Sequence, residues 1–170
     1  MKPLSIHPRW DLIFTPKGFA ILNACLIGLA AELAAVALKQ GVDWLRFWRV
    51  QLALHFSPWL WLPILGLVGG GLAGWLINQF APEAVGSGVP HFKAVLAGFP
   101  IRLDGRVALT KLVSNMVTLG SGITLGRQGP TVHIGAALAA QLSRWAPTTP
   151  DYRRQMIAAG AAARLAAGFN

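Results

Sequence analysis

The stretch that decides the fold runs from Leu119 to Gly135 and reads Leu-Gly-Ser-Gly-Ile-Thr-Leu-Gly-Arg-Gln-Gly-Pro-Thr-Val-His-Ile-Gly. Pro130 marks the start of a helix, because proline lacks an amide hydrogen that the first turn would leave unpaired anyway. The glycines before it have no side chain, so the backbone there is flexible and can approach a ligand closely. We therefore predict a helix N-terminus whose free amides and positive dipole end suit an anion. The residues of this motif are Gly126, Arg127, Gln128, Gly129 and Pro130.

A second stretch of the same kind lies upstream and consists of Gly86, Ser87, Gly88, Val89 and Pro90. Serine is a favoured N-cap and proline is tolerated in the first turn, so a helix is expected to begin here too. Taken alone, this motif is also explained by an ordinary capped turn. Two such helix starts in one small apolar chain favour a shared anion site, which needs no buried counter-charge.

The composition places these motifs in a membrane protein. The chain has 170 residues, of which 54% are hydrophobic and 12% charged, whereas a soluble domain carries about 25% charged residues. This excludes a disordered, collagen-like or disulfide-rich chain and leaves one integral membrane domain. The net charge is +9, but the cations are scattered rather than clustered, so we predict no nucleic-acid partner.

The first half of the chain contains two apolar runs that are long enough to cross a bilayer. Phe19–Leu38 is the first span, Lys39–Ser57 a polar and aromatic connector at the membrane interface, and Trp59–Phe80 the second span. The second span carries a ridge of glycines, including Gly70 and Gly74, that permits close helix packing. Residues 1–17 are interpreted as an interfacial arm, with a signal peptide as the alternative.

After Phe80 the apolar segments become short and are interrupted by glycine and proline. Broken helices are tolerated at membrane depth where protein or a watery cavity satisfies their backbone, and in transporters they mark the substrate site. The predicted short helices are Val85–Phe99, Val107–Leu125, Pro130–Trp145 and Met156–Phe169.

Several polar residues inside these segments have two interpretations each. Lys111, Ser114, Asn115, Thr118 and Gly122 share one helix face, which fits either helix packing or a pore lining. Glu32, in the first span, is expected to face the bundle rather than to carry protons. Ser121 and His133 are expected not to act as a nucleophile and base, since no nucleophile motif surrounds them.

The histidines show no ligand spacing, so the sequence predicts no metal site, no cofactor and no enzymatic activity. They lie far apart along the chain, at His7, His55, His91 and His133.

The two motifs resemble those of the CLC chloride channel and chloride/proton exchanger family. Residues 86–90 are similar to the family's Gly-Ser-Gly-Ile-Pro, and residues 126–130 to its Gly-Arg-Glu-Gly-Pro. The resemblance extends from about residue 16 to residue 170. It also includes Ala81–Ala84, Thr131–Gly135, Gly160–Ala163 and Phe169-Asn170.

This resemblance implies an all-α, polytopic membrane protein in which residues 18–170 form most of the first inverted repeat of the family's membrane domain. Ser87 would offer its hydroxyl to the central chloride, and the amides around Gln128 and Gly129 would face the outer sites. It further implies chloride and the lipid bilayer as partners, a homodimer for the full-length chain, and a place in the plasma membrane of a prokaryote.

The family's second motif carries a glutamate that acts as the gate and, in the exchangers, carries the proton. This chain has Gln128 there. An amide has a similar shape but no charge and no titration in the physiological range. We therefore predict passive chloride conduction without proton exchange.

Two departures from the family pattern affect this interpretation. Arg164 stands where the family has a small residue, and its charge is costly in a membrane helix without water or a partner. The chain also lacks the family's second repeat, so it is interpreted as a fragment of a longer chloride/proton antiporter or channel, a truncated remnant without transport activity, or a subunit completed by a separate chain.

Overall fold

The computed structural model describes residues 16–55, 57–126, 128–145 and 149–168, and the predicted arm lies mostly outside them. Within these ranges the chain is helical and contains no strand. In order, the elements are α1 (Pro16–His55), α2 (Pro58–Phe80), the 3-10 turn η2 (Pro82–Ala84), α3 (Val89–Leu96), α4 (Gly105–Gly120), α5 (Gln128–Ser143) and α6 (Pro150–Gly168).

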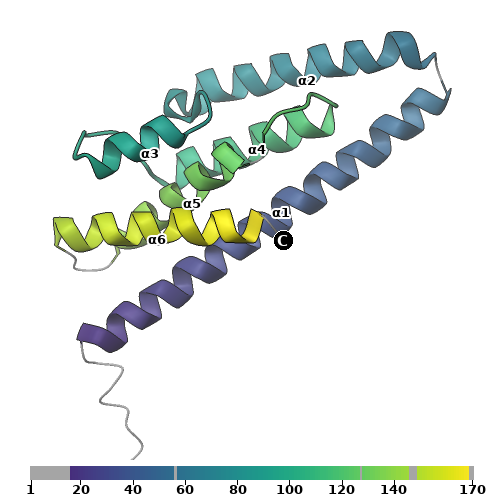
Figure 1. Ribbon diagram of the computed structural model, residues 1–170. Helices are drawn as coiled ribbons and strands as arrows, with labels where there is room; N and C mark the ends of the chain where they lie inside the picture. Colours follow the sequence, from purple (N-terminus) through teal and green to yellow (C-terminus); the bar gives the residue numbers. More distant parts are fainter. Residues whose placement is uncertain (1–15, 56, 127, 146–148, 169–170) are drawn as a thin grey trace, which may run out of the picture.

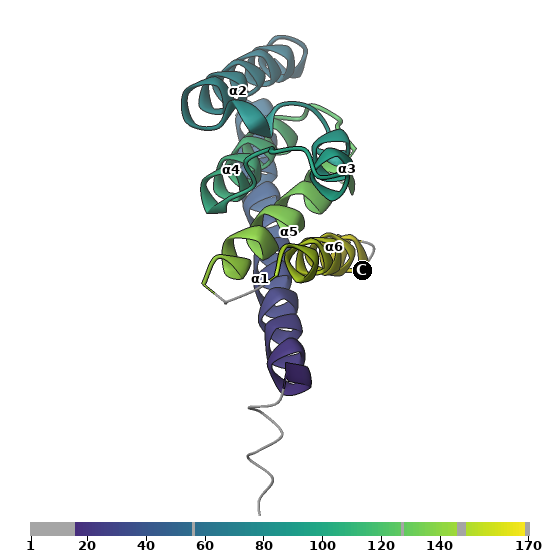
Figure 2. The ribbon, with the colours of Figure 1, turned by 90° about the vertical axis from the view of Figure 1, so that its left-hand side faces the viewer.

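The two long helices enclose the short ones. α1 and α2 meet at one end of the molecule and diverge, and α4 lies between them in contact with both (Figure 1). α5 lies at the centre and packs against α1, α3, α4 and α6, as the second view also shows (Figure 2). α5 therefore carries most of the fully buried positions, including Ala136, Ala137, Ala139 and Ala140.

The prediction of a connector over Lys39–Ser57 is wrong, because α1 continues as one helix to His55. The segment contains no proline before Pro58, and its long and aromatic side chains are compatible with a helix. Three aromatic residues on this part of α1 are exposed and lie edge to face, with ring centroids 6.2 and 6.4 Å apart. They are Trp44, Phe47 and Trp48.

The second predicted span is confirmed as α2, which begins one residue earlier, at Pro58. α1 from Ile21 and α2 are both long and apolar enough to cross a membrane. The glycine ridge of α2 packs where expected at Gly69 and Gly70: a Cβ at Gly69 would overlap Ser121, and one at Gly70 would lie 3.1 Å from Ile123. Gly74 faces open space.

The four predicted short helices are all present. Their bounds differ from the prediction: α3 begins four residues later than Val85, α4 ends at Gly120 rather than at Leu125, and α6 begins at Pro150 rather than at Met156. The sequence Thr149-Pro150-Asp151 is a helix N-terminus signal, and the Thr149 hydroxyl accepts a hydrogen bond from the amide of Tyr152 at 3.3 Å. Because the residues of this first turn are polar, the apolar pattern alone does not show where the helix starts.

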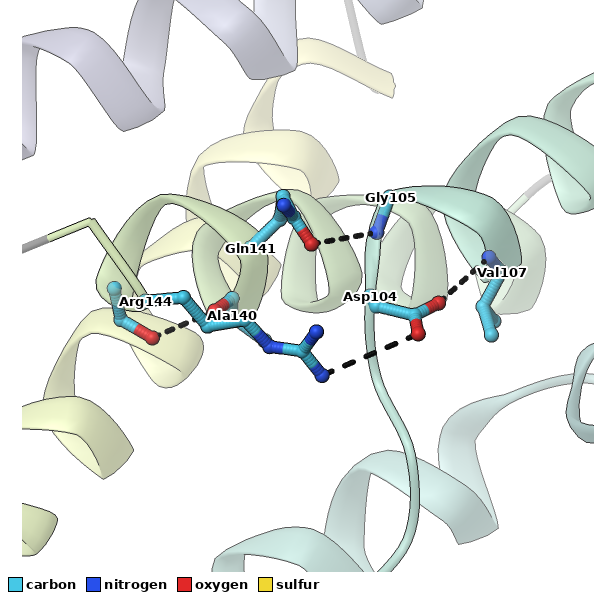
Figure 3. Close-up of polar contacts among 7 residues, drawn as sticks. Asp104, Gly105, Val107, Ala140, Gln141 and Arg144 are labelled. Carbon is cyan, nitrogen blue, oxygen red and sulfur yellow. Dashed lines mark hydrogen bonds and ion pairs between the residues drawn. The ribbon is translucent and has the colours of Figure 1, made fainter.

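The beginning of α4 is tied to the last turns of α5 (Figure 3). Asp104 caps α4 by accepting from the Val107 amide at 3.2 Å, and the Gln141 side chain accepts from the Gly105 amide at 3.2 Å. Arg144 lies 4.0 Å from the Asp104 carboxylate. These contacts fix α4 against α5.

α5 and α6 cross at two glycines. A Cβ at Gly135 would overlap the Gly160 carbonyl oxygen, and one at Gly160 would lie 2.5 Å from both Ala139 and the Gly135 carbonyl. One turn beyond Gly160, Arg164 is 1% exposed and donates to the Ala34 carbonyl of α1 at 3.1 Å. The buried guanidinium thus has a backbone partner, and the carboxylate of Glu32 also interacts with it electrostatically.

Candidate anion-binding site

The first motif forms the loop that leads into α3. The expectation that Ser87 caps this helix is wrong, because the N-cap is Gly88, in a left-handed conformation with φ of +82° that favours glycine. Val89 is the first helical residue, Pro90 the second. The Ser87 hydroxyl makes no hydrogen bond to the described part of the chain and is exposed, so it is free to bind a ligand.

The second motif forms the start of α5, which begins at Gln128, two residues before Pro130. The first amides of a helix have no partner within it, so those of Gln128, Gly129 and Thr131 are available. The Thr131 hydroxyl donates to the Gln128 carbonyl at 2.6 Å. Gly126 precedes the helix in open space, and the predicted Arg127 lies outside the described residues.

The structure brings the two motifs together at Ser87 and Gly129. A Cβ added to Gly129 would lie 2.7 Å from the Ser87 carbonyl oxygen and 3.0 Å from the Ser87 Cβ. Gln128 is exposed beside this contact. The N-terminal turns of α3 and α5 therefore meet at one junction, where a hydroxyl and unpaired amides are close to each other.

Lys111 of α4 holds the loop before this junction. Its side chain is 4% exposed, and its ammonium group donates to the carbonyls of Ala84, at 2.6 Å, and Gly86. Gly86 has a left-handed φ of +75°. The buried lysine thus fixes the turn that presents Ser87, a role that the sequence did not indicate.

The rest of the polar face of α4 packs within the bundle. Ser114, Asn115 and Thr118 are buried, and each side chain donates to a carbonyl of the same helix. Of the two interpretations of this face, the structure favours helix packing. Gly122 lies beyond the end of α4, with a φ of +105°.

The remaining polar residues that the sequence singled out lie in separate environments. Glu32 is exposed, but its carboxylate acts electrostatically on the buried Arg164 of α6, so the expectation that it faces the bundle is confirmed only in part. Ser121 donates to the Thr118 carbonyl at 2.8 Å and packs against Gly69 of α2, whereas His133 packs against α3. The structure does not bring this serine and histidine together.

The sequence did not lead us to predict that two histidines pair at the junction. His91 of α3 and His133 of α5 stack with ring centroids 5.6 Å apart and an angle of 8° between the ring planes. The pairing could have been predicted from where each histidine stands relative to a helix start, although not from the distance between the histidines along the chain. His91 follows Pro90, and His133 lies three residues after Pro130. If both prolines mark helix starts that meet, side chains in these first turns meet as well.

The fold and the site together define a helical membrane domain in which two broken helices direct their N-termini at one junction. Residues 69–170 match the family described as "Voltage gated chloride channel". The chain belongs to this family.

Similar proteins agree with this assignment. The H(+)/Cl(-) exchange transporter ClcA of Salmonella arizonae is 38% identical, and that of Klebsiella pneumoniae 35%, each over 88% of this chain. A crystal structure of a slow cyanobacterial Cl-/H+ antiporter matches with a TM-score of 0.78 and 32% identity, over 88% of this chain and 36% of that one. The chain spans about a third of the length of the curated relatives. The predicted all-α fold of the family is thus confirmed.

Proposed function

We propose that this chain supplies one half of a chloride pathway and binds the anion at the junction of α3 and α5. The observation that carries the proposal is the contact between Ser87 and Gly129, which brings the residue with the free hydroxyl against the first turn of α5. Amide and hydroxyl donors with the positive end of a helix dipole favour a small anion. The activity is transport, with chloride as the transported ligand and without a cofactor.

We further propose that transport is passive. The first residue of α5 is Gln128, which is exposed at the junction. A glutamine side chain carries no negative charge that could occupy an anion site, and no proton that it could release. Chloride would then move along its gradient without proton exchange.

Liposomes that contain this chain as part of the full-length protein test this proposal, because the chain supplies only one half of the pathway. Under an outward chloride gradient we expect chloride efflux without uphill proton movement. The variant Gln128→Glu should make chloride flux fall as the pH rises and the carboxylate ionises, whereas Gln79→Glu at the exposed end of α2 should not. Uphill proton flux in the unmodified chain would contradict passive transport, and the absence of any anion flux would support a remnant without transport activity.

The setting proposed for the chain is the plasma membrane of a prokaryote, crossed several times, with homodimers of the full-length protein. Support comes from the bacterial origin of the relatives and from the two helices that are long enough to span a bilayer.

A methyl group at the junction should weaken anion binding. In Gly129→Ala the new Cβ would lie 2.7 Å from the Ser87 carbonyl oxygen, so Ser87 must move away from the α5 amides. We expect bromide affinity, measured by calorimetry in chloride-free detergent solution, to fall about tenfold, or about 1.4 kcal/mol. Gly74→Ala on α2, outside both motifs, is the matched control, since nothing lies near its Cβ. Equal affinities of the two variants would contradict the proposed site.

A further inference from the structure

His133 is buried without a hydrogen-bond partner. Its exposed fraction is 0%, and neither ring nitrogen has a partner within the described residues; Nδ1 of His91 is in the same situation. Leaving a buried polar group unpaired costs about 1–3 kcal/mol. A bound species that accepts a hydrogen bond from the ring would satisfy this group.

The unpaired imidazole lies at the junction described above. Gly129 and His133 are four residues apart, so they occupy one face of α5. Ser87 and Gly88 run along that face: Ser87 lies against Gly129, and the ring of His133 lies against Gly88. Helical side chains lean toward the N-terminus of their helix. The ring is therefore directed toward the end of α5 where the free amides are.

The surroundings of His133 favour a negative ligand. The charge of Lys111 acts electrostatically on the imidazole, and the lysine already donates to two carbonyls. The neighbouring His91 ring is stacked on it at 8°, so the two rings contact each other through their faces and not through their nitrogen atoms. Among the described residues, the groups that act electrostatically on this ring are Lys111 and His91, and neither is acidic.

We propose that His133 is a further anion ligand of this site, donating an imidazole N–H to the halide that Ser87 and the α5 amides also bind. This assignment rests on the proposed function, because it adds a side-chain donor to the same site. The ligand class is a small monovalent anion.

Calorimetric titration of the chain with sodium bromide in chloride-free detergent solution tests the proposal. His133→Leu removes the donor and should weaken bromide binding about tenfold, while His133→Gln retains an N–H donor and should stay within about threefold. His55→Leu, at an exposed position on α1, is the matched control and should bind as the unmodified chain does. Equal affinity of His133→Leu and the unmodified chain would overturn the assignment.

A second measurement avoids any loss of folding in the variants. With 15N-labelled histidine in the unmodified chain, bromide should shift the ring-nitrogen resonances that disappear in His133→Gln. If bromide binds but these resonances stay in place, His133 is not a ligand and the proposed function survives. If the unmodified chain binds no bromide at all, both proposals fail.

Discussion

Replacing Gly135 by valine is expected to prevent the chain from folding. The position faces α6 so closely that even a Cβ would overlap the Gly160 carbonyl oxygen and lie 2.6 Å from the Cβ of Arg164. The obstacle is backbone, which cannot rotate away as a side chain can. α5 is the central helix and α6 crosses it in close contact (Figure 2). Separating them would cost at least about 3 kcal/mol, a large part of the stability of a small domain.

The measurement is size-exclusion elution and thermal unfolding in detergent. Gly71→Val and Gly74→Val are matched controls, because both glycines lie in the helical part of α2 with nothing near a Cβ. These variants should elute and unfold as the unmodified chain does. A Gly135→Val variant with an unchanged melting temperature would show that α5 and α6 are not held together at this crossing.

The close crossing also shows what the sequence did not reveal. Gly135 and Gly160 stand inside apolar segments that were predicted correctly as helices. Which helices pack against each other depends on side-chain shape across the bundle, which apolar runs do not encode. Small residues indicate close helix packing but do not show which helix packs against them.

The starts of α3 and α5 were predictable to within a few residues because proline and glycine act locally. Pro90 and Pro130 both lie in first turns, as expected. The detail at Ser87 was not predictable from residue preferences. Serine is a good N-cap, but here the turn needs a left-handed residue immediately before the helix, and Gly88 meets that requirement.

The continuation of α1 to His55 was missed for a different reason. Polar and aromatic residues over 39–57 were interpreted as an interface connector, which is a statement about environment rather than about backbone conformation. A helix can extend through that environment when no proline or capping signal stops it. The first stop in this part of the chain is Pro58, where α2 begins.

The largest effect at the site itself is expected for Lys111→Met. The substitution keeps most of the side-chain volume but removes the ammonium group that donates to the Ala84 and Gly86 carbonyls. An unpaired buried polar group costs about 1–3 kcal/mol, so leaving both carbonyls unpaired should cost about 2–6 kcal/mol. The turn with Gly86 at a φ of +75° then loses its restraint from α4.

Because this turn presents Ser87 to Gly129, we expect Lys111→Met to lower the melting temperature and also to weaken bromide binding at least tenfold. Lys93→Met is the matched control, since Lys93 is exposed on α3 and its charge lies outside the turn. The two readouts separate the two roles of Lys111. A lower melting temperature with unchanged bromide affinity would mean that the lysine stabilises the bundle but does not position Ser87, and an unchanged melting temperature would contradict its role in holding the turn.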